Sequence, residues 1–219
     1  MRADDPFTDL VTTLEGVVDQ EAMLERALQD MRFVLLQQDP KVAAMEVELP
    51  GTLDKMIAAM RPVMQRHMEA SVREHRQEMA ALLRASLTPA EAADMANFYV
   101  SPLGRRLVQG ASESYSLKAT LSEYVRNDYE GDTTTDAVRR DTRAAVLPAL
   151  AGLTDAERAS LAQTFAKASW ARKLTALQPK IMELQARATS RPMAPEIEAE
   201  MERAIMAVVE EAVAARQAD

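Results

Sequence analysis

The apolar residues of this chain recur every three or four positions, which is the spacing of α-helices. The first segment shows it best, with one polar interruption, at Phe7, Leu10, Leu14, Val17, Glu21, Leu24, Leu28, Met31 and Leu35. No stretch shows the alternation with period two that is typical of a half-exposed strand. We therefore predict an all-α protein with no sheet, whose first helix runs from Phe7 to a break at Asp39-Pro40.

Prolines, glycines and capping residues divide the remaining sequence into further helices. Pro40 can open a short helix that reaches Leu49, and Thr52 is expected to cap a long helix that ends near Ser86. The later segments are a helix from 89 that restarts at 102, a helix that ends near 152, a helix from 154 that restarts at 169 and is interrupted at 179, and a last helix over 195–216. In total we expect about seven or eight helices.

Two stretches of the chain resemble each other. L-T-P-A-E-A-A-D-M-A-N-F-Y-V-S-P-L-G-R-R-L, which starts at Leu87, matches L-T-D-A-E-R-A-S-L-A-Q-T-F-A-K-A-S-W-A-R-K-L, which starts at Leu153, with one inserted residue. Both begin with a capping box, and Phe98 aligns with Phe165. We interpret the chain as two divergent helical halves, residues 1–130 and 136–219, joined by a linker at 131–135 and packed together.

The stretch F-Y-V-S-P-L-G-R-R-L, from Phe98 to Leu107, resembles the hallmark of the bacterial domain-of-unknown-function family numbered 2059, which reads F-Y-x-S-P-x-G and then two basic residues. The stretch R-K-L-T-A-L-Q-P-K-I-M from Arg172 is similar to the segment on the carboxyl side of that hallmark in the same family. The second copy departs from the hallmark, because Ala-Ser-Trp-Ala at 168–171 stands where Ser-Pro-Leu-Gly is expected. The resemblance implies an all-helical protein, usually exported to the periplasm, with no established catalytic role.

The hallmark has a structural and a functional interpretation. Ser101 can cap a helix that starts at Pro102, and a glycine at 104 allows another backbone to approach closely. In the functional interpretation, Tyr99, Arg105 and Arg106 surround this helix amino terminus and bind an anionic group, which the helix dipole would favour.

Charge and composition exclude several classes of protein. Residues 1–54 contain twelve acidic and four basic residues, a net charge of −8 that equals the net charge of the whole chain. An acidic segment of this kind repels phosphate groups, so we expect no nucleic-acid partner. No uncharged run approaches the roughly 18 residues of a membrane span, and Met1 to Asp9 do not resemble a basic and apolar signal peptide. The chain has no cysteine, which excludes disulfides and thiolate chemistry.

The methionines of the long third helix are the main candidate for a binding site. Met56, Met60, Met64 and Met68 fall within an arc of about 120° on a helix, which is also the width of an ordinary buried face. A polar line of His67, Ser71, Glu74 and Glu78 runs down this face, and buried charges need partners or solvent. Either the face opens into a cleft with His67 and Glu74 at its mouth, or arginines of a neighbouring helix cover the line.

A copper site would use the thioethers together with a histidine. His67 and His75 are eight residues apart, about 12 Å along a helix, so they cannot complete one shell, and we expect neither a metal nor a cofactor. None of the common catalytic motifs occurs, so we expect no enzyme. The remaining alternative is a weak hydrolase, for which His67 with Glu74 is the only acid–base candidate.

The sequence therefore favours a non-enzymatic helical protein of the bacterial envelope. We expect it to bind an apolar partner, either a lipid-like ligand or an exposed protein segment, through the face with Met56, Met60, Met64 and Met68. The alternative is a structural or self-associating helical module without a ligand, whose first helix can pack against a second copy in a homodimer.

Overall fold

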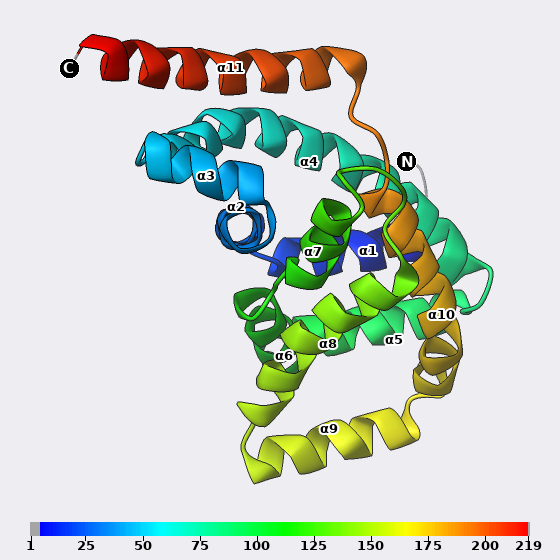
Figure 1. The fold of residues 1–219 in the computed structure, drawn as a ribbon. Coiled ribbons are helices and arrows are strands. Elements are labelled where there is room, and N and C mark those ends of the chain that lie inside the picture. Colours follow the sequence, from blue (N-terminus) through cyan, green and yellow to red (C-terminus); the bar gives the residue numbers. More distant parts are fainter. Residues whose placement is uncertain (1–4, 219) are drawn as a thin grey trace.

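The computed structural model describes residues 5–218, which form eleven helices and no strand (Figure 1). The helices are α1 (Pro6–Val17), α2 (Gln20–Gln38), α3 (Pro40–Glu48), α4 (Thr52–Arg84), α5 (Pro89–Val100), α6 (Pro102–Glu113), α7 (Lys118–Arg126), α8 (Thr135–Ala151), α9 (Asp155–Lys167), α10 (Ser169–Thr189) and α11 (Pro195–Ala218). The all-α class is confirmed. The predicted number of seven or eight helices is wrong.

The predicted first helix is in fact two helices. Val18 adopts an extended conformation, and the side chain of Asp19 accepts a hydrogen bond from the backbone N–H of Ala22, so that Asp19 caps α2. Asp5 caps α1 in the same way, by accepting from the backbone N–H of Thr8. The apolar spacing continues across the break because both helices turn their apolar sides inward, and spacing alone did not reveal the cap.

The start of α4 also differs from the prediction. Thr52 is the first helical residue and not the cap, which is Gly51 with a φ of +82° and no side-chain hydrogen bond. The carboxylate of Glu46 replaces the missing cap by accepting from the backbone N–H groups of Gly51 (2.6 Å) and Leu53 (3.0 Å). Prolines lie inside α4, α8 and α10, and the interruption predicted at Pro179 is absent because α10 continues through it.

The capping boxes are confirmed. In α5 the Thr88 side chain caps the backbone N–H of Glu91, and the Glu91 carboxylate accepts from the backbone N–H of Thr88. Thr154 and Glu157 make the same two bonds at the start of α9. Each box satisfies two N–H groups that the helix itself leaves without a partner.

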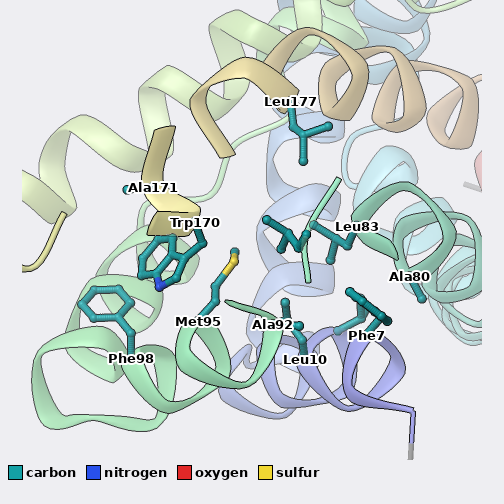
Figure 2. Close-up of a cluster of buried hydrophobic side chains, with 12 residues drawn as sticks. Phe7, Leu10, Ala80, Leu83, Ala92, Met95, Phe98, Trp170, Ala171 and Leu177 are labelled. Atoms are coloured by element: carbon teal, nitrogen blue, oxygen red, sulfur yellow. The ribbon is translucent and has the colours of Figure 1, made fainter. Parts of the chain in front are cut away.

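The main hydrophobic core lies between α1, α4, α5 and α10 (Figure 2). Its largest side chain is Trp170, which is fully buried and whose indole N–H donates to Asp94 of α5 over 2.7 Å. Figure 2 shows Trp170 beside Phe98 and Met95, with Phe7 and Leu10 of α1 on the other side of Ala92. Within the described residues, no helix is both long and apolar enough to cross a bilayer.

Candidate functional site

The methionine face, which we define as Met56, Met60, Met64 and Met68, lies on the first half of α4. Met60 is buried with 7% of its surface exposed, and the other three side chains are half-buried. Long α11 runs beside α4 at the edge of the molecule (Figure 1). The methionines are therefore neither a free surface nor a fully enclosed core.

Ion pairs show which helices lie on either side of the methionine face. They are, toward α11, Lys55–Glu211 at 3.6 Å and Arg66–Glu200 at 2.5 Å, and toward α2, Arg61–Glu25 at 2.6 Å and Arg61–Glu21. At about 100° per residue, Lys55 and Arg66 lie about 120–140° from Met60 in one direction, and Arg61 lies about 100° away in the other. The methionine face thus lies on the side of α4 between the residues that pair with α11 and the residue that pairs with α2.

The covering helix α11 is loosely held. None of its side chains is buried, and its ion pairs with α4 and α3 join groups that are 46–74% exposed. Exposed ion pairs of this kind contribute about 0–1 kcal/mol each. Helices with few buried contacts belong to the part of a protein that opens most easily.

The polar line on α4 meets an arginine from the connection between α10 and α11. Arg191 donates to Glu78 over 3.1 Å and also to Glu74. His67 is half-buried, and no hydrogen bond or ion pair links it to Glu74 among residues 5–218. The two glutamates are thus paired, and Arg191 fixes the connection that leads into α11.

His75 lies between Glu74 and Glu78 on α4 and is half-buried. Burial lowers the pKa of the His75 imidazole, and its Nδ1 has no hydrogen-bond partner among residues 5–218. Within the same residues, one oxygen of Glu78 also has no partner. The sequence pattern could not indicate that His75 is the histidine whose pKa is lowered by burial, because the neighbouring helices decide burial.

The first corner, which we define as residues Phe98 to Leu107, joins α5 to α6. Ser101 accepts from the backbone N–H of Gly104 over 3.1 Å and donates to the carbonyl of Phe98 over 2.6 Å. A Cβ added to Gly104 would lie 2.1 Å from that carbonyl oxygen. The predicted structural roles of Ser101 and Gly104 are therefore both present, because only glycine fits this close backbone contact.

The three residues proposed to bind an anion have separate environments. Tyr99 packs against the hydrophobic core, and burial raises the pKa of its hydroxyl. Arg105 donates to the carbonyl of Val100 over 2.8 Å. Arg106 donates to Glu157 over 2.7 Å and to the carbonyl of Gly152 over 3.1 Å. Both arginines are engaged by groups of the protein itself.

The second corner, residues Phe165 to Leu174, joins α9 to α10 and packs directly on the first. The rings of Phe98 and Phe165 meet edge to face with their centroids 5.5 Å apart. Arg106 of α6 pairs with Glu157 in the capping box of α9, and Lys173 of α10 pairs with Glu91 in the capping box of α5 over 2.6 Å. Each corner therefore supplies a cation to the capping glutamate of the helix that leads into the other corner.

These pairs perturb the capping glutamates. The hydrogen bond from Lys173 lowers the pKa of Glu91 to about 2. For Glu157 the hydrogen bonds from Thr154 are the main cause of a lowered pKa, and Arg106 lowers it further. Both carboxylates are ionised at neutral pH and so complete their capping boxes.

Sequence reasoning missed a cluster of buried carboxylates at the start of α7. Asp30 of α2 accepts from the backbone N–H of Leu117, and Asp141 of α8 accepts from those of Ala119 and Thr120, over 2.8–3.0 Å. Burial next to these two acids raises the pKa of Tyr115. The start of α7 has no cap of its own, so two distant helices supply the acceptors.

Two surface hollows lie away from the methionine face. One has a volume of about 350 Å³ between α6 and the end of α8, near Arg106 and Pro148, and the other has about 620 Å³ near Arg126 and Arg140. No methionine lines either hollow. Within residues 5–218, no group of three or more metal-binding side chains comes together.

Comparison with known proteins gives one match. Residues 73–116 match a family described as an uncharacterized protein conserved in bacteria (DUF2059). The matched stretch contains the end of α4, α5, the first corner and α6. The second corner lies outside it. No curated protein and no solved structure matches the chain.

Proposed function

We propose that this chain is a non-enzymatic binding protein of the bacterial envelope that holds an apolar partner against the methionine face. The partner is a lipid-like molecule or an apolar protein segment. One observation carries the proposal: three methionines of this face are half-buried on α4, and α11, the long helix that packs along α4, has no buried side chain. Flexible thioether side chains adapt to partners of different shapes, which suits a site of this kind.

Binding requires α11 to move away from α4 as a unit. Arg191 and its pairs with Glu74 and Glu78 hold the start of the connection, while the exposed ion pairs along α11 are weak. An amphipathic segment or an acyl chain can then take the place of α11 on the methionines. Recognition of this kind corresponds to a helix bound in a groove.

The second candidate is a structural or self-associating module in which α11 stays packed on α4. It is supported by the pairing of Glu74 and Glu78 with Arg191, which gives both carboxylates a partner within the protein. The absence of methionines from both hollows also favours it. A homodimer belongs to this candidate, since large apolar side chains such as Met206 on α11 are exposed.

We also propose that the chain contains two divergent copies of a four-helix unit. The first unit is α4–α7 and the second is α8–α11. Their principal contacts are reciprocal: α6 and α7 of the first unit pack on α8, and α10 and α11 of the second unit pack on α4. The exchanged cations Arg106 and Lys173 follow the same pattern. These reciprocal contacts support a twofold pseudo-dimer.

Binding of a hydrophobic dye to the folded chain tests the proposed function. Anilinonaphthalene sulfonate should gain fluorescence with the wild-type protein, and Met64→Lys should reduce the gain at least threefold, because a charge on the methionine face opposes apolar binding. Met206→Lys is the matched control, since Met206 is 48% exposed on the surface of α11, and it should leave the gain unchanged. Met64→Leu should also bind, and circular dichroism checks that each variant is folded.

Native mass spectrometry of protein purified from its own host gives a second test. A ligand binder should carry a bound small molecule or a captured peptide of defined mass. Absence of both, together with no dye fluorescence from the folded wild-type chain, would favour the closed module.

A further inference from the structure

Three helices meet around the larger of the two surface hollows. Helix α7 lies between α2 and α8 and packs on both (Figure 1). The hollow, which we call the arginine hollow, has a volume of about 620 Å³ and is lined by Gln38 of α2, by Ala119, Ser122 and Arg126 of α7, and by Arg140 of α8. None of these lining residues, which all belong to the described part of the chain, is a carboxylate. Two helices therefore bring two positive charges to one hollow.

The guanidinium of Arg126 is held in place but is not neutralised. Its Nε donates to the backbone carbonyl of Ser122, one turn earlier in α7, over 3.0 Å. The acid closest to it along the helix, Glu123, pairs with Arg140 instead, and Arg126 forms no ion pair within residues 5–218. The two terminal nitrogens of Arg126 therefore keep their hydrogens for an acceptor from outside the chain.

Arg140 is held only weakly by the protein. Its contact with the Glu123 carboxylate is 3.5 Å long, whereas a strong charged hydrogen bond measures roughly 2.7–2.9 Å. Glu123 is bound more closely by Thr134, whose backbone N–H and hydroxyl donate to it over 3.0 and 2.9 Å. Arg140 can therefore turn to an anion in the hollow while Glu123 keeps the hydrogen bonds from Thr134.

Ser122 adds a neutral donor to the arginine hollow. The side-chain amide of Gln38 donates to the Ser122 hydroxyl oxygen over 2.8 Å. A hydroxyl that accepts one hydrogen bond still has its own hydrogen to donate, and no acceptor among residues 5–218 receives it. The hollow thus offers two guanidinium groups and one hydroxyl, and contacts with α2 and within α7 orient two of these three donors.

The smaller hollow lacks this surplus of positive charge. Its lining contains Glu113 as well as Arg106, and Arg106 already pairs with Glu157. Near the arginine hollow, Asp39 and Asp141 do not line the cavity, and each accepts hydrogen bonds from two backbone N–H groups. The net charge of −8 of the whole chain opposes every anion, so an anion that binds here must be held by close contacts.

We propose that the arginine hollow binds the phosphate group of a small organic molecule, supplied by a soluble phosphomonoester or by a lipid headgroup with a terminal phosphate. Such a group carries about −1.5 to −2 charges at pH 7 and three terminal oxygens, which match two guanidinium groups and one hydroxyl. A carboxylate has only two oxygens, and one guanidinium can bind both. The volume of the hollow lies in the range of sites for whole small molecules, roughly 300–1,000 Å³, so the rest of the ligand can lie against Gln38 and Ala119.

Isothermal titration calorimetry of the full chain with glycerol 3-phosphate tests the proposal. We expect saturable binding of one molecule per chain, weakened at least about tenfold by Arg126→Gln with Arg140→Gln, because both variants remove charged hydrogen bonds. The matched control is Arg139→Gln with Arg143→Gln, which removes the same charge from exposed positions of α8 outside the lining and should change the affinity less than twofold. All four side chains are exposed, and circular dichroism checks that both double variants are folded.

A second probe distinguishes the two sources of the phosphate. Phosphatidylcholine vesicles that contain phosphatidic acid are sedimented with the protein. Vesicle binding that is lost in Arg126→Gln with Arg140→Gln but kept in the control, without binding of glycerol 3-phosphate, would assign the hollow to a lipid headgroup. Binding of glycerol 3-phosphate with the same dependence on the variants would assign it to a soluble ligand.

Four results would overturn the proposal. The first is the absence of binding to both probes. Equal loss in the two double variants would show that the net charge of this region, and not the hollow, attracts the anion. Succinate that binds more tightly than glycerol 3-phosphate would make the hollow a carboxylate site, and inorganic phosphate that binds as tightly would show recognition of the ion alone. Dye binding at the methionine face is measured separately and does not depend on these results, because no methionine lines the arginine hollow.

Discussion

The two corners of this protein make the same turn by different means. At the first corner, Ser101 caps α6, Pro102 occupies its first turn and Gly104 touches the backbone of the preceding helix. At the second corner, Ala168 provides no side-chain cap. Trp170 is instead fully buried and bound to Asp94. One turn is therefore held by local backbone chemistry and the other by tertiary packing.

The consequence is a difference in what each corner tolerates. A local turn should be sensitive to changes in backbone contact and tolerant of changes in side-chain size. A turn held by packing should show the opposite behaviour. Three paired substitutions test this comparison, from the largest expected effect to the smallest.

Removal of the core side chain should affect the second corner most. Trp170→Ala should lower the free energy of unfolding by about 3–5 kcal/mol, because it leaves a large cavity and an unpaired Asp94. At the matched position of the first corner, Leu103 is half-buried, and Leu103→Ala should cost about 1–2 kcal/mol. Urea denaturation followed by circular dichroism measures both, and equal losses would show that the two corners are held alike.

Substitution of the small residue in each turn should instead destabilise the first corner more than the second. Gly104→Ala places a Cβ 2.1 Å from the Phe98 carbonyl oxygen. It should lower the free energy of unfolding by about 3 kcal/mol, because the backbone must shift. Ala171 is the matched residue, and Ala171→Gly should cost only about 1 kcal/mol through greater freedom of the unfolded chain. Urea denaturation measures both variants. If each lowered the free energy of unfolding by about 1 kcal/mol, the close backbone contact at Gly104 would not be what holds the first corner.

Removal of the cation from the ion pairs Lys173–Glu91 and Arg106–Glu157 should have the smallest effect, which is measured as a change in the pKa of the glutamate. The pKa of Glu91 is lowered to about 2 from an ordinary value of 4.5, so its contribution is complete above the ordinary value and is lost as the pH falls through about 2. Lys173→Met should move the pKa of Glu91 upward by more than Arg106→Met moves that of Glu157, because Lys173 is the main cause of the first shift and Arg106 a minor cause of the second.

Carboxyl-detected NMR titration can follow both glutamates in each variant. A titration in which Lys173→Met leaves Glu91 unchanged, while Arg106→Met raises the pKa of Glu157, would reverse the expected order. Both variants keep the Thr88 and Thr154 hydroxyls that form the capping boxes, so the comparison isolates the cations.

Much of the fold could be predicted from particular residues. The capping boxes at Thr88 and Thr154, the cap at Ser101 and the close approach at Gly104 all depend on neighbours within a few positions, and each occurs as predicted. The break before α2 escaped prediction although Asp19 is a good cap, because the apolar spacing continues through it. Predictions of function at the methionine face and at Tyr99, Arg105 and Arg106 remain to be tested by experiment.

The sequence by itself determined the helical class, the capping boxes and the geometry of the first corner, because hydrogen bonds and steric contacts between near neighbours decide them. Only the tertiary structure decided where α7 begins, since Asp30 and Asp141 reach its first N–H groups from helices far along the chain. It also decided that Arg191 pairs with Glu74 and Glu78, and that Arg126 and Arg140 line one hollow. These features depend on which helices meet, and helix spacing carries no information about the partner that each apolar side will find.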